Sequence, residues 1–480
     1  MSNTAAERLG VLLLAIALAA QIVIALPAGP TSLHGDEVYY VAKAQYFGEH
    51  HRFPRATEND LAVERGELRG LSDWRPQGYA LFLALCANGS YDQTALRWRV
   101  TLVQSTLVAI ALIFVFLALR RYMTSATLRI AAALILGIAP WPFEFVQTLG
   151  PDSCVASFTA IALLLLGRYP RSVFFATLLF SLTFAMRPEM IVLPPLIAGC
   201  AMLFQERRRL RFAVAAATAF LIVFGAHYAY RIGFTGQRLP PVFGGLHIPD
   251  RGAFAWTNTW IGTENESYNF VYSLTNGQPP PPLPARAFAN DGERHVVETI
   301  VSDVRAAGGY SEADDDRFAA LARLRQRENP ARAVAARLWH TVHLWVNVEV
   351  NTQTLNLLSN VSRPVRHAIL GALMLLKIGL LAGFLLFIVH LRALRNDVFL
   401  VLCAIYVIAR TLLIGIVLGW FTHRYVVNAW IPLVACVLAA LTRASNRPQF
   451  SPAAREPIDR STTNPRDSAA SRTATALREA

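Results

Sequence analysis

The chain has 480 residues, of which 54% are hydrophobic and only 16% charged, and its formal net charge is +13. A water-soluble globular protein rarely has this composition, and several stretches of about 20 apolar residues match the length that crosses the hydrocarbon core of a bilayer. The positive charge does not require a nucleic-acid partner, because many of the arginines lie in short turns between the apolar stretches.

The apolar segments predict an all-α polytopic membrane protein with about 10 membrane-spanning helices. The predicted spans are residues 9–27, 98–119, 127–146, 152–167, 172–186, 189–204, 211–231, 367–390, 398–420 and 425–442. If the N-terminus lies on the inner side, every short arginine-rich turn falls on that side, as the positive-inside rule requires. The first span is expected to stay as an uncleaved anchor, because its apolar region is long for a signal peptide.

This topology places three connections on the outer side, where functional groups are expected: residues 28–97, the turn near 143–153, and residues 232–366. The predicted domains are an N-terminal transmembrane catalytic module (1–231, with the first outer loop 28–97), an outer lid or cap (232–366), C-terminal transmembrane helices (367–442) and a disordered inner tail (443–480).

The first outer loop begins with two adjacent carboxylates, Asp36 and Glu37, directly after the first span. Charge this close to lipid is costly unless it faces a cavity, a partner or a substrate. Residues 38–47 repeat apolar and aromatic side chains at near-helical spacing, which predicts an interfacial helix. Residues 76–85 predict a second juxtamembrane helix, because Pro76 suits a first helical turn and the apolar run is too short to span. Together these helices would cover the bundle beside the carboxylates.

Three further polar positions fall on the predicted outer side. Asp152 follows Pro151 at the start of a span, Arg187 stands beside Pro188 and Glu189, and Arg424-Tyr425 precedes the last span. With Asp36-Glu37, their order and sidedness resemble the GT-C glycosyltransferases, in particular the dolichyl-phosphate-mannose protein mannosyltransferases and the bacterial lipid A aminoarabinose transferases. The resemblance covers roughly residues 9–205 and 367–442.

This resemblance implies a polyprenyl-phosphate-sugar donor and transfer on the periplasmic face of a bacterial inner membrane. A positioned carboxylate can take the proton of an acceptor hydroxyl, and Asp36 is the predicted base. The alternative for Asp36 is a helix cap. Glu37 either orients the site or faces solvent. Asp152 either orients the acceptor, binds a divalent metal with Asp36, or stabilises a helix N-terminus.

Cations are predicted to bind the donor phosphate, because the arginine fork of donors suits phosphate oxygens. Arg187 and Arg424 lie on the outer side, where the positive-inside rule gives no reason for them, and His423 is adjacent. The alternatives are a local pair of Arg187 with Glu189 and an interface anchor for Arg424. Arg410, deep in an apolar stretch, either binds phosphate or pairs with a buried carboxylate.

The segment 232–366 divides at a proline-rich stretch, 278–284, which predicts an extended linker. Before it, residues 232–272 show few helix signals, and Trp256 and Trp260 are candidates for stacking on a sugar or for anchoring at the membrane surface. Tyr40 of the first loop is a further candidate sugar contact. After the linker, residues 291–308, 312–328 and 330–345 predict helices, with a boundary at Asn329-Pro330.

No cofactor is expected with certainty, and a divalent metal at Asp36 and Asp152 stays an open alternative. The five cysteines lie in apolar runs without a C-x-x-C pair, so neither a disulfide framework nor a cysteine zinc site is expected. His340 and His343 share a helix face, but no third ligand lies at useful spacing.

The resulting hypothesis is an inverting glycosyltransferase that moves a sugar from a polyprenyl-phosphate carrier to a lipid or glycan of the cell envelope. Inversion follows if the base lies opposite the leaving group. One alternative is a transporter or lipid flippase, which would show inverted repeats and broken helices. Others are a protein O-mannosyltransferase of the same family and a non-catalytic subunit of envelope assembly.

Overall fold

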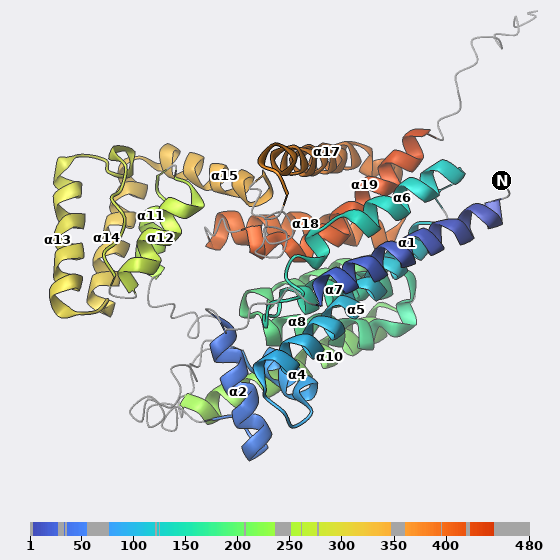
Figure 1. Cartoon of the computed structure of the whole chain (residues 1–480), viewed down its shortest axis with the longest axis horizontal. Coiled ribbons are helices and arrows are strands. Elements are labelled where there is room, and N and C mark those ends of the chain that lie inside the picture. Colours follow the sequence, from blue (N-terminus) through green and yellow to red (C-terminus); the bar gives the residue numbers. More distant parts are fainter. Residues whose placement is uncertain are drawn as a thin grey trace, which may run out of the picture.

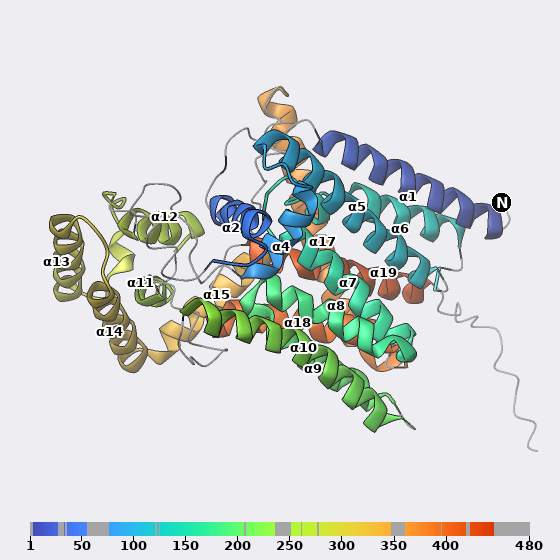
Figure 2. The ribbon, with the colours of Figure 1, turned by 90° about the horizontal axis from the view of Figure 1, so that it is seen from below.

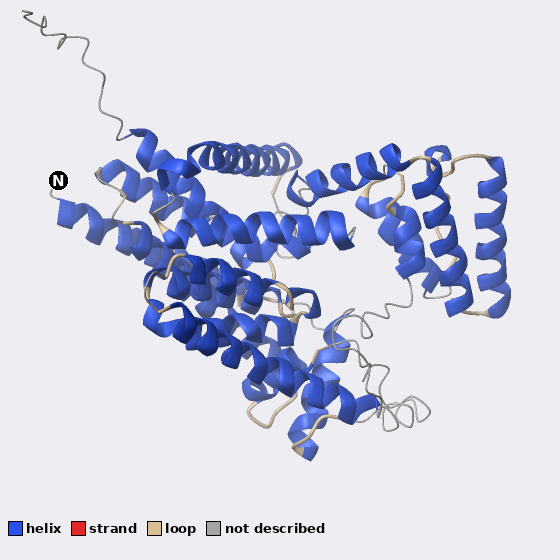
Figure 3. Ribbon diagram, turned by 180° about the vertical axis from the view of Figure 1, so that it is seen from behind, coloured by secondary structure: helices blue, strands red, loops and turns tan. Residues whose placement is uncertain are grey.

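The structure is a computed structural model that describes residues 3–26, 33, 36–54, 76–120, 122–123, 125–205, 208–235, 251–260, 262–275, 278–346, 361–394, 396–418 and 423–445. These residues form helices and turns with no strand among them, as Figure 3 shows. The all-α class is confirmed for this part of the chain. The predictions for residues 55–75 and for the tail beyond 445 lie outside the described residues.

Seven stretches of the described residues are helical, at least 18 residues long and apolar enough to cross a membrane. They involve α1 (Asn3–Ala25), α5 (Gln93–Leu119), α6 (Ala126–Ile138) with η1 (Trp141–Phe143), α10 (Arg209–Thr235), α17 (Arg363–Leu394), α18 (Val398–Leu412) with the π-helical η5 (Leu413–Leu418), and η6 (His423–Ala429) with α19 (Trp430–Ser445). The protein is therefore a multi-pass membrane protein.

The other three predicted spans are shorter helices. α7 (Asp152–Arg168), α8 (Val173–Met186) and α9 (Leu193–Leu203) have 17, 14 and 11 residues, and the 3-10 turn η2 (Pro170–Ser172) connects the first two. An α-helix rises about 1.5 Å per residue, so α7 is roughly 25 Å long against a hydrocarbon core of about 30 Å. The predicted number of about ten spans stays a prediction.

Helix α7 lies inside the bundle and packs against α5, α8 and α18, whereas α1 and α6 lie side by side along one flank (Figure 1). Alanine, serine and cysteine make up much of the buried face of α7, and small side chains let helices approach closely. Gly167 shows the effect, because a Cβ atom there would run into the backbone of Phe399 on α18.

The bundle has two distinct ends. The first turns of α1 and α6 and the last turn of α19 lie at one end, called here the N-terminal end, and α11–α14 lie beyond the opposite end, called the site end (Figure 1). At the N-terminal end Arg120 Nη1 lies 2.6 Å from Glu7 Oε1, and Arg168 Nη2 lies 3.0 Å from Asp397 Oδ2. These pairs connect neighbouring helices where the chain turns back.

Two helices cover the site end. α2 (Asp36–His50) and α4 (Gln77–Ala87) pack against each other (Figure 2), so both helices predicted from the first loop are confirmed. Pro76 stands one residue earlier than expected, at the N-cap with an extended backbone. The rings of Tyr40 and Tyr79 meet edge to face with centroids 5.0 Å apart, and Tyr40 is only 3% exposed. Tyr40 is thus a packing residue rather than an accessible sugar contact.

The segment from residue 251 to 346 contains α11 (Arg251–Thr257), α12 (Glu264–Thr275), the turn η4 (Ala285–Ala287), α13 (Asp291–Ala307), α14 (Glu312–Glu328) and α15 (Pro330–Val346). The three helices predicted after the proline-rich stretch are confirmed, including the boundary at Asn329. Ser311 and Asp314 form a capping box at the start of α14. The expectation of little helix before residue 272 is wrong, because α11 and α12 are stabilised by tertiary packing that local signals do not reveal.

The tryptophans of this segment belong to its interior, so the prediction that they stack on a sugar or anchor at the membrane finds no accessible ring. Trp256 and Trp260 are both fully buried, and Trp256 lies in a hydrophobic core with Phe270, Ile300 and Phe318. The indole Nε1 of Trp256 donates to Glu293 Oε1 at 2.8 Å. Burial of a large aromatic ring with its N–H satisfied is a stabilising arrangement.

The contact between α7 and α18 can be tested with Gly167→Ala. The added methyl group must push Phe399 and its helix away, so we expect the free energy of unfolding to fall by about 1–3 kcal/mol. The matched control is Gly379→Ala on α17, where a Cβ would meet nothing within 4 Å. The control should keep or slightly raise the thermal midpoint of the purified protein in detergent. Equal midpoints for the two variants would contradict the packing described here.

Candidate functional site

Charged side chains from separate parts of the chain form one continuous network at the site end. Arg424, on η6, bridges two carboxylates: its Nε donates to Asp152 Oδ2 at 2.8 Å, and its Nη2 lies 3.4 Å from Asp36 Oδ2. Asp36 is the first residue of α2 and Asp152 the first of α7. The two predicted acidic residues and one predicted cation are therefore in direct contact.

The network continues inward from Asp152. Arg187 Nη2 contacts Asp152 Oδ1, and Arg187 Nη1 donates to Glu189 Oε1 at 3.1 Å. The same Glu189 oxygen lies 3.3 Å from Arg410 Nη2, and Arg410 Nε donates to the carbonyl oxygen of Tyr425 at 3.0 Å. For each arginine the structure shows the predicted ion pair: Arg187 pairs with Glu189, and Arg410 pairs with the same buried carboxylate.

Exposure falls steeply along this network. The side chains of Arg424 and Asp36 are 30% and 25% exposed, whereas Asp152 is 3% and Arg410 0% exposed. Three arginines alternate with three carboxylates, so the charges balance, as buried ions require. A molecule approaching the site end can reach Asp36 and Arg424, while Arg187 and Arg410 are covered.

Local sequence explains how these groups converge. Arg187 ends α8 with an extended backbone (φ −141°, ψ 106°), and the short η3 (Pro188–Met190) turns Glu189 back toward it. Gly150 precedes α7, and a Cβ there would lie 3.6 Å from Arg424 Nη2 and 3.7 Å from Asp152 Oδ2. A carboxylate in the first turn of α7 is also favoured by the helix dipole.

A second ion pair, between Arg97 and Glu37, holds the first turn of α2. Arg97 on α5 donates from Nη2 to Glu37 Oε2 at 2.8 Å and from Nη1 to Glu37 Oε1 at 3.0 Å. Arg97 Nη1 also donates to the carbonyl of Gln147, and the N–H of Leu149 donates to Glu37 Oε1 at 2.9 Å. Glu37 is buried in these bonds, so of the two predicted possibilities the solvent-facing one is wrong. Glu37 positions α2, and with it Asp36.

Arg97 was missed by the sequence reasoning, although a signal was present. It lies at the predicted outer end of the span 98–119, where the positive-inside rule gives no reason for an arginine. The same argument singled out Arg187 and Arg424. Applied to every outer arginine, it would have included Arg97.

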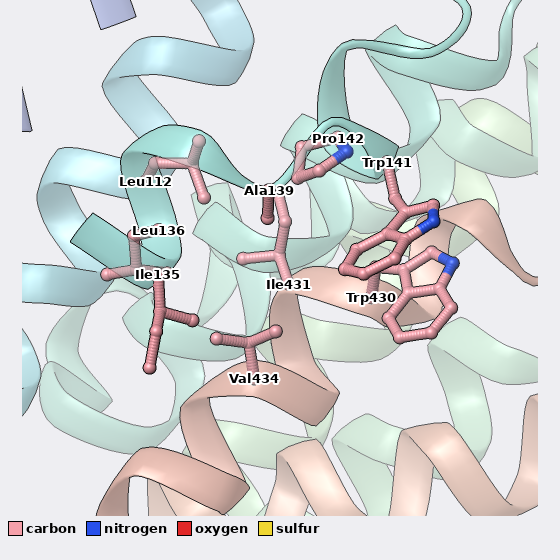
Figure 4. A pocket seen from close by; sticks show the side chains of 9 residues that line it. All are labelled: Leu112, Ile135, Leu136, Ala139, Trp141, Pro142, Trp430, Ile431 and Val434. Atoms are coloured by element: carbon pink, nitrogen blue, oxygen red, sulfur yellow. The ribbon is translucent and has the colours of Figure 1, made fainter. Parts of the chain in front are cut away.

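An aromatic cluster supports η6 from the other side. Trp141 and Trp430 stack with ring centroids 4.7 Å apart beside a small apolar cavity (Figure 4), and Trp345 of α15 meets Trp430 edge to face at 5.2 Å. Lys377 Nζ lies 5.4 Å from the Trp430 centroid. The ring of Tyr425 lies 5.1 Å from the Arg187 guanidinium. These contacts hold the short helix that carries Arg424 against the bundle.

The remaining predictions concern His423, a metal site and the histidines of α15. His423 begins η6, but its side chain lies outside what the structure describes. Arg424 stands between Asp36 and Asp152, the two carboxylates considered for a metal. Within the described residues no group of three histidine, cysteine, aspartate or glutamate side chains is arranged to hold a metal ion. Burial lowers the pKa of His340 to about 4, so this imidazole is neutral at neutral pH.

Comparison with protein-family models finds no match to this chain, and comparison with curated protein sequences finds none either.

The role of Glu37 can be tested with Glu37→Gln. Neutralising this carboxylate leaves the buried Arg97 without its counter-charge, which should lower the free energy of unfolding by about 3 kcal/mol or more. The double variant Glu37→Gln/Arg97→Met removes both charges and should recover much of the lost stability. Thermal unfolding of the purified protein measures both. A wild-type midpoint for the single variant would exclude a structural pair.

Proposed function

We propose that this protein is an inverting membrane glycosyltransferase. It would move a sugar from a polyprenyl-phosphate carrier to a lipid or glycan acceptor on the periplasmic face of a bacterial inner membrane. The observation that supports this best is the accessible pair at the site end, where the carboxylate of Asp36 lies 3.4 Å from the guanidinium of Arg424. The groups that a base and a phosphate-binding cation would require, a carboxylate and a guanidinium, are therefore adjacent at one end of the bundle.

The proposed reaction needs both groups at once. Asp36 takes the proton of the acceptor hydroxyl as its oxygen forms a bond to the anomeric carbon of the donor sugar. The bond between that carbon and the phosphate oxygen breaks, and the electron pair leaves with the lipid phosphate. The leaving phosphate gains negative charge, which the Arg424 fork stabilises more strongly than the charge of the donor. Attack opposite the leaving group inverts the anomeric centre.

The buried part of the network has a positioning role in this proposal. Asp152 accepts a hydrogen bond from Arg424 Nε, and Arg187 holds Asp152 in turn. Arg410 fixes Glu189, the other partner of Arg187. Arg187 and Arg410 would therefore act through Asp152 on the orientation of Arg424 rather than bind phosphate themselves. A divalent metal between Asp36 and Asp152 stays an alternative that requires Arg424 to move aside.

The 251–346 segment would serve as a lid over the acceptor. Its last helix, α15, reaches the break between α18 and α19: Arg337 Nη1 donates to the carbonyl of Ile416 in η5 at 3.3 Å, and Trp345 Nε1 donates to Thr411 Oγ1 at 3.2 Å. An acceptor bound under this segment would thus lie near the element that carries Arg424.

The central test is Asp36→Asn in a strain that lacks the gene. Removal of the base should lower product formation by about 100-fold or more. The measurement is mass spectrometry of envelope lipids and glycans, in which one sugar mass disappears on deletion and returns only with the wild-type gene. The matched control is Asp92→Asn, because Asp92 caps α5 through Ala95 N and asparagine caps equally well.

Full restoration by Asp36→Asn at normal protein level would overturn the proposal. Asp36 would then be a helix cap, and a transporter or an assembly subunit would become the better explanation.

The second test is Arg424→Lys. A single ammonium group cannot bridge two carboxylates and also present a fork to phosphate, so we expect kcat/KM for the lipid-phosphate donor to fall about tenfold or more. The matched control is Arg286→Lys, which changes an exposed arginine paired with Glu266 in the 251–346 segment. Wild-type kinetics for Arg424→Lys would show that the fork does not hold the phosphate.

A further inference from the structure

A groove far from the charged network runs between α8, α9 and α10. Its volume is about 310 Å³, and small residues such as Gly199, Ala216 and Ala217 form much of its wall, with Phe212 and Phe220 beside them. A Cβ at Gly199 would meet nothing within 4 Å. Gly199 and Ala217 are exposed, so the groove is open toward the surroundings of the bundle.

One polar group lines this apolar groove. Thr177 of α8 is only 1% exposed, and its hydroxyl has no hydrogen-bond partner among the residues that the structure describes. Burial of a hydroxyl without a partner is unfavourable. If the Thr177 side chain turns its hydroxyl toward the groove, a ligand that brings an acceptor oxygen there would remove that cost, which a purely hydrocarbon ligand cannot do.

The groove also has a basic end. Arg208, Arg209 and Arg211 are exposed at the start of α10, at the N-terminal end of the bundle. Arg209 lies one helical turn before Phe212 and Ala213 on the same face of α10. It donates from Nε to the carbonyl of Gln205 at 2.8 Å, which holds its fork beside the last turn of α9.

We propose that this groove binds an anionic glycerophospholipid. The phosphate would lie at Arg209, an ester carbonyl would accept from Thr177 Oγ1, and an acyl chain would follow Ala213, Ala216 and Phe220. Thr177 lies four residues after the start of α8, or about 6 Å along that helix. In a glycerophospholipid the ester carbonyls lie just below the phosphate.

The polar anchors favour this lipid over a polyprenyl tail. A polyprenyl phosphate could bring its phosphate to Arg209, but it has no ester carbonyl below the phosphate that could accept a hydrogen bond from Thr177. The inference therefore does not rest on the proposed function, and a transporter or assembly subunit could have the same site.

The test uses the full-length protein in a zwitterionic detergent, with dioleoyl-phosphatidylglycerol, dioleoyl-phosphatidylcholine or undecaprenyl phosphate added separately. A ligand that binds the folded state raises the thermal midpoint by mass action. We expect phosphatidylglycerol to raise it by about 3 °C or more and phosphatidylcholine by less than about 1 °C. Equal shifts for these two lipids would overturn the proposal.

Variants locate the site. Gly199→Leu fills the groove and should abolish the shift, and Ala217→Phe repeats this from the opposite wall in case the first variant folds poorly. Gly371→Leu makes the same change at an open position on α17 and should keep the full shift. Thr177→Val, which replaces the hydroxyl with a methyl group, should at least halve it.

The headgroup end is tested with Arg209→Gln, which should remove the preference for phosphatidylglycerol. The matched control is Arg392→Gln, at another exposed arginine, in the last turn of α17. A shift that survives Gly199→Leu and Ala217→Phe would place the lipid elsewhere. A larger shift with undecaprenyl phosphate that Gly199→Leu removes would assign the groove to a polyprenyl chain. Either result overturns the proposal.

Discussion

The guanidinium of Arg424 connects three elements that are distant in the sequence: α2, α7 and η6. Its two carboxylate partners each begin a helix, so this side chain connects the starting points of α2 and α7. Behind it, charges of opposite sign alternate down to Arg410, which is completely buried. Burying any one of these ions alone would be strongly unfavourable, and their alternation makes the whole arrangement feasible. The geometry of the site end therefore depends on the complete set rather than on a single pair.

The hydrophobic pattern of the sequence was sufficient to predict the helical class, the two helices over the site end and the three helices after the proline-rich stretch. It also identified Asp36, Asp152, Arg187 and Arg424 as charged residues on the predicted outer side, next to apolar segments. It could not predict which charges pair, because Asp152 and Arg424 meet only when α7 and η6 pack together. Trp256 shows a similar limit: an aromatic residue near a predicted membrane surface has the same local pattern whether it anchors at the interface or fills a core. Glu37 and Asp36 are adjacent in the chain, yet one is buried with Arg97 and the other is accessible. That division depends on the direction of each side chain from α2.

The break between α18 and α19 links the 251–346 segment to the charged network. The π-helical η5 and the 3-10 helix η6 interrupt what would otherwise be regular helices, and such irregular turns occur often at functional sites. α15 packs on η5, and its Trp345 reaches Trp430 just after η6. The helical segment 251–346 and the charged network therefore contact each other through a short stretch of chain, although none of the described residues of that segment belongs to the network itself.

The exact compensation of three positive by three negative side chains has a further consequence for how a ligand finds the site. A cluster without net charge produces a field that fades quickly with distance, so these six side chains themselves contribute little long-range attraction for an anion. If an anion binds at Arg424 as proposed, its recognition would begin only at contact, where the shape of the guanidinium fork would decide what is accepted. A soluble anion would therefore bind with a low association rate constant. A ligand already confined to the plane of the membrane searches in two dimensions and loses little by the absence of long-range attraction, and its capture should be almost insensitive to the ionic strength of the surrounding solution.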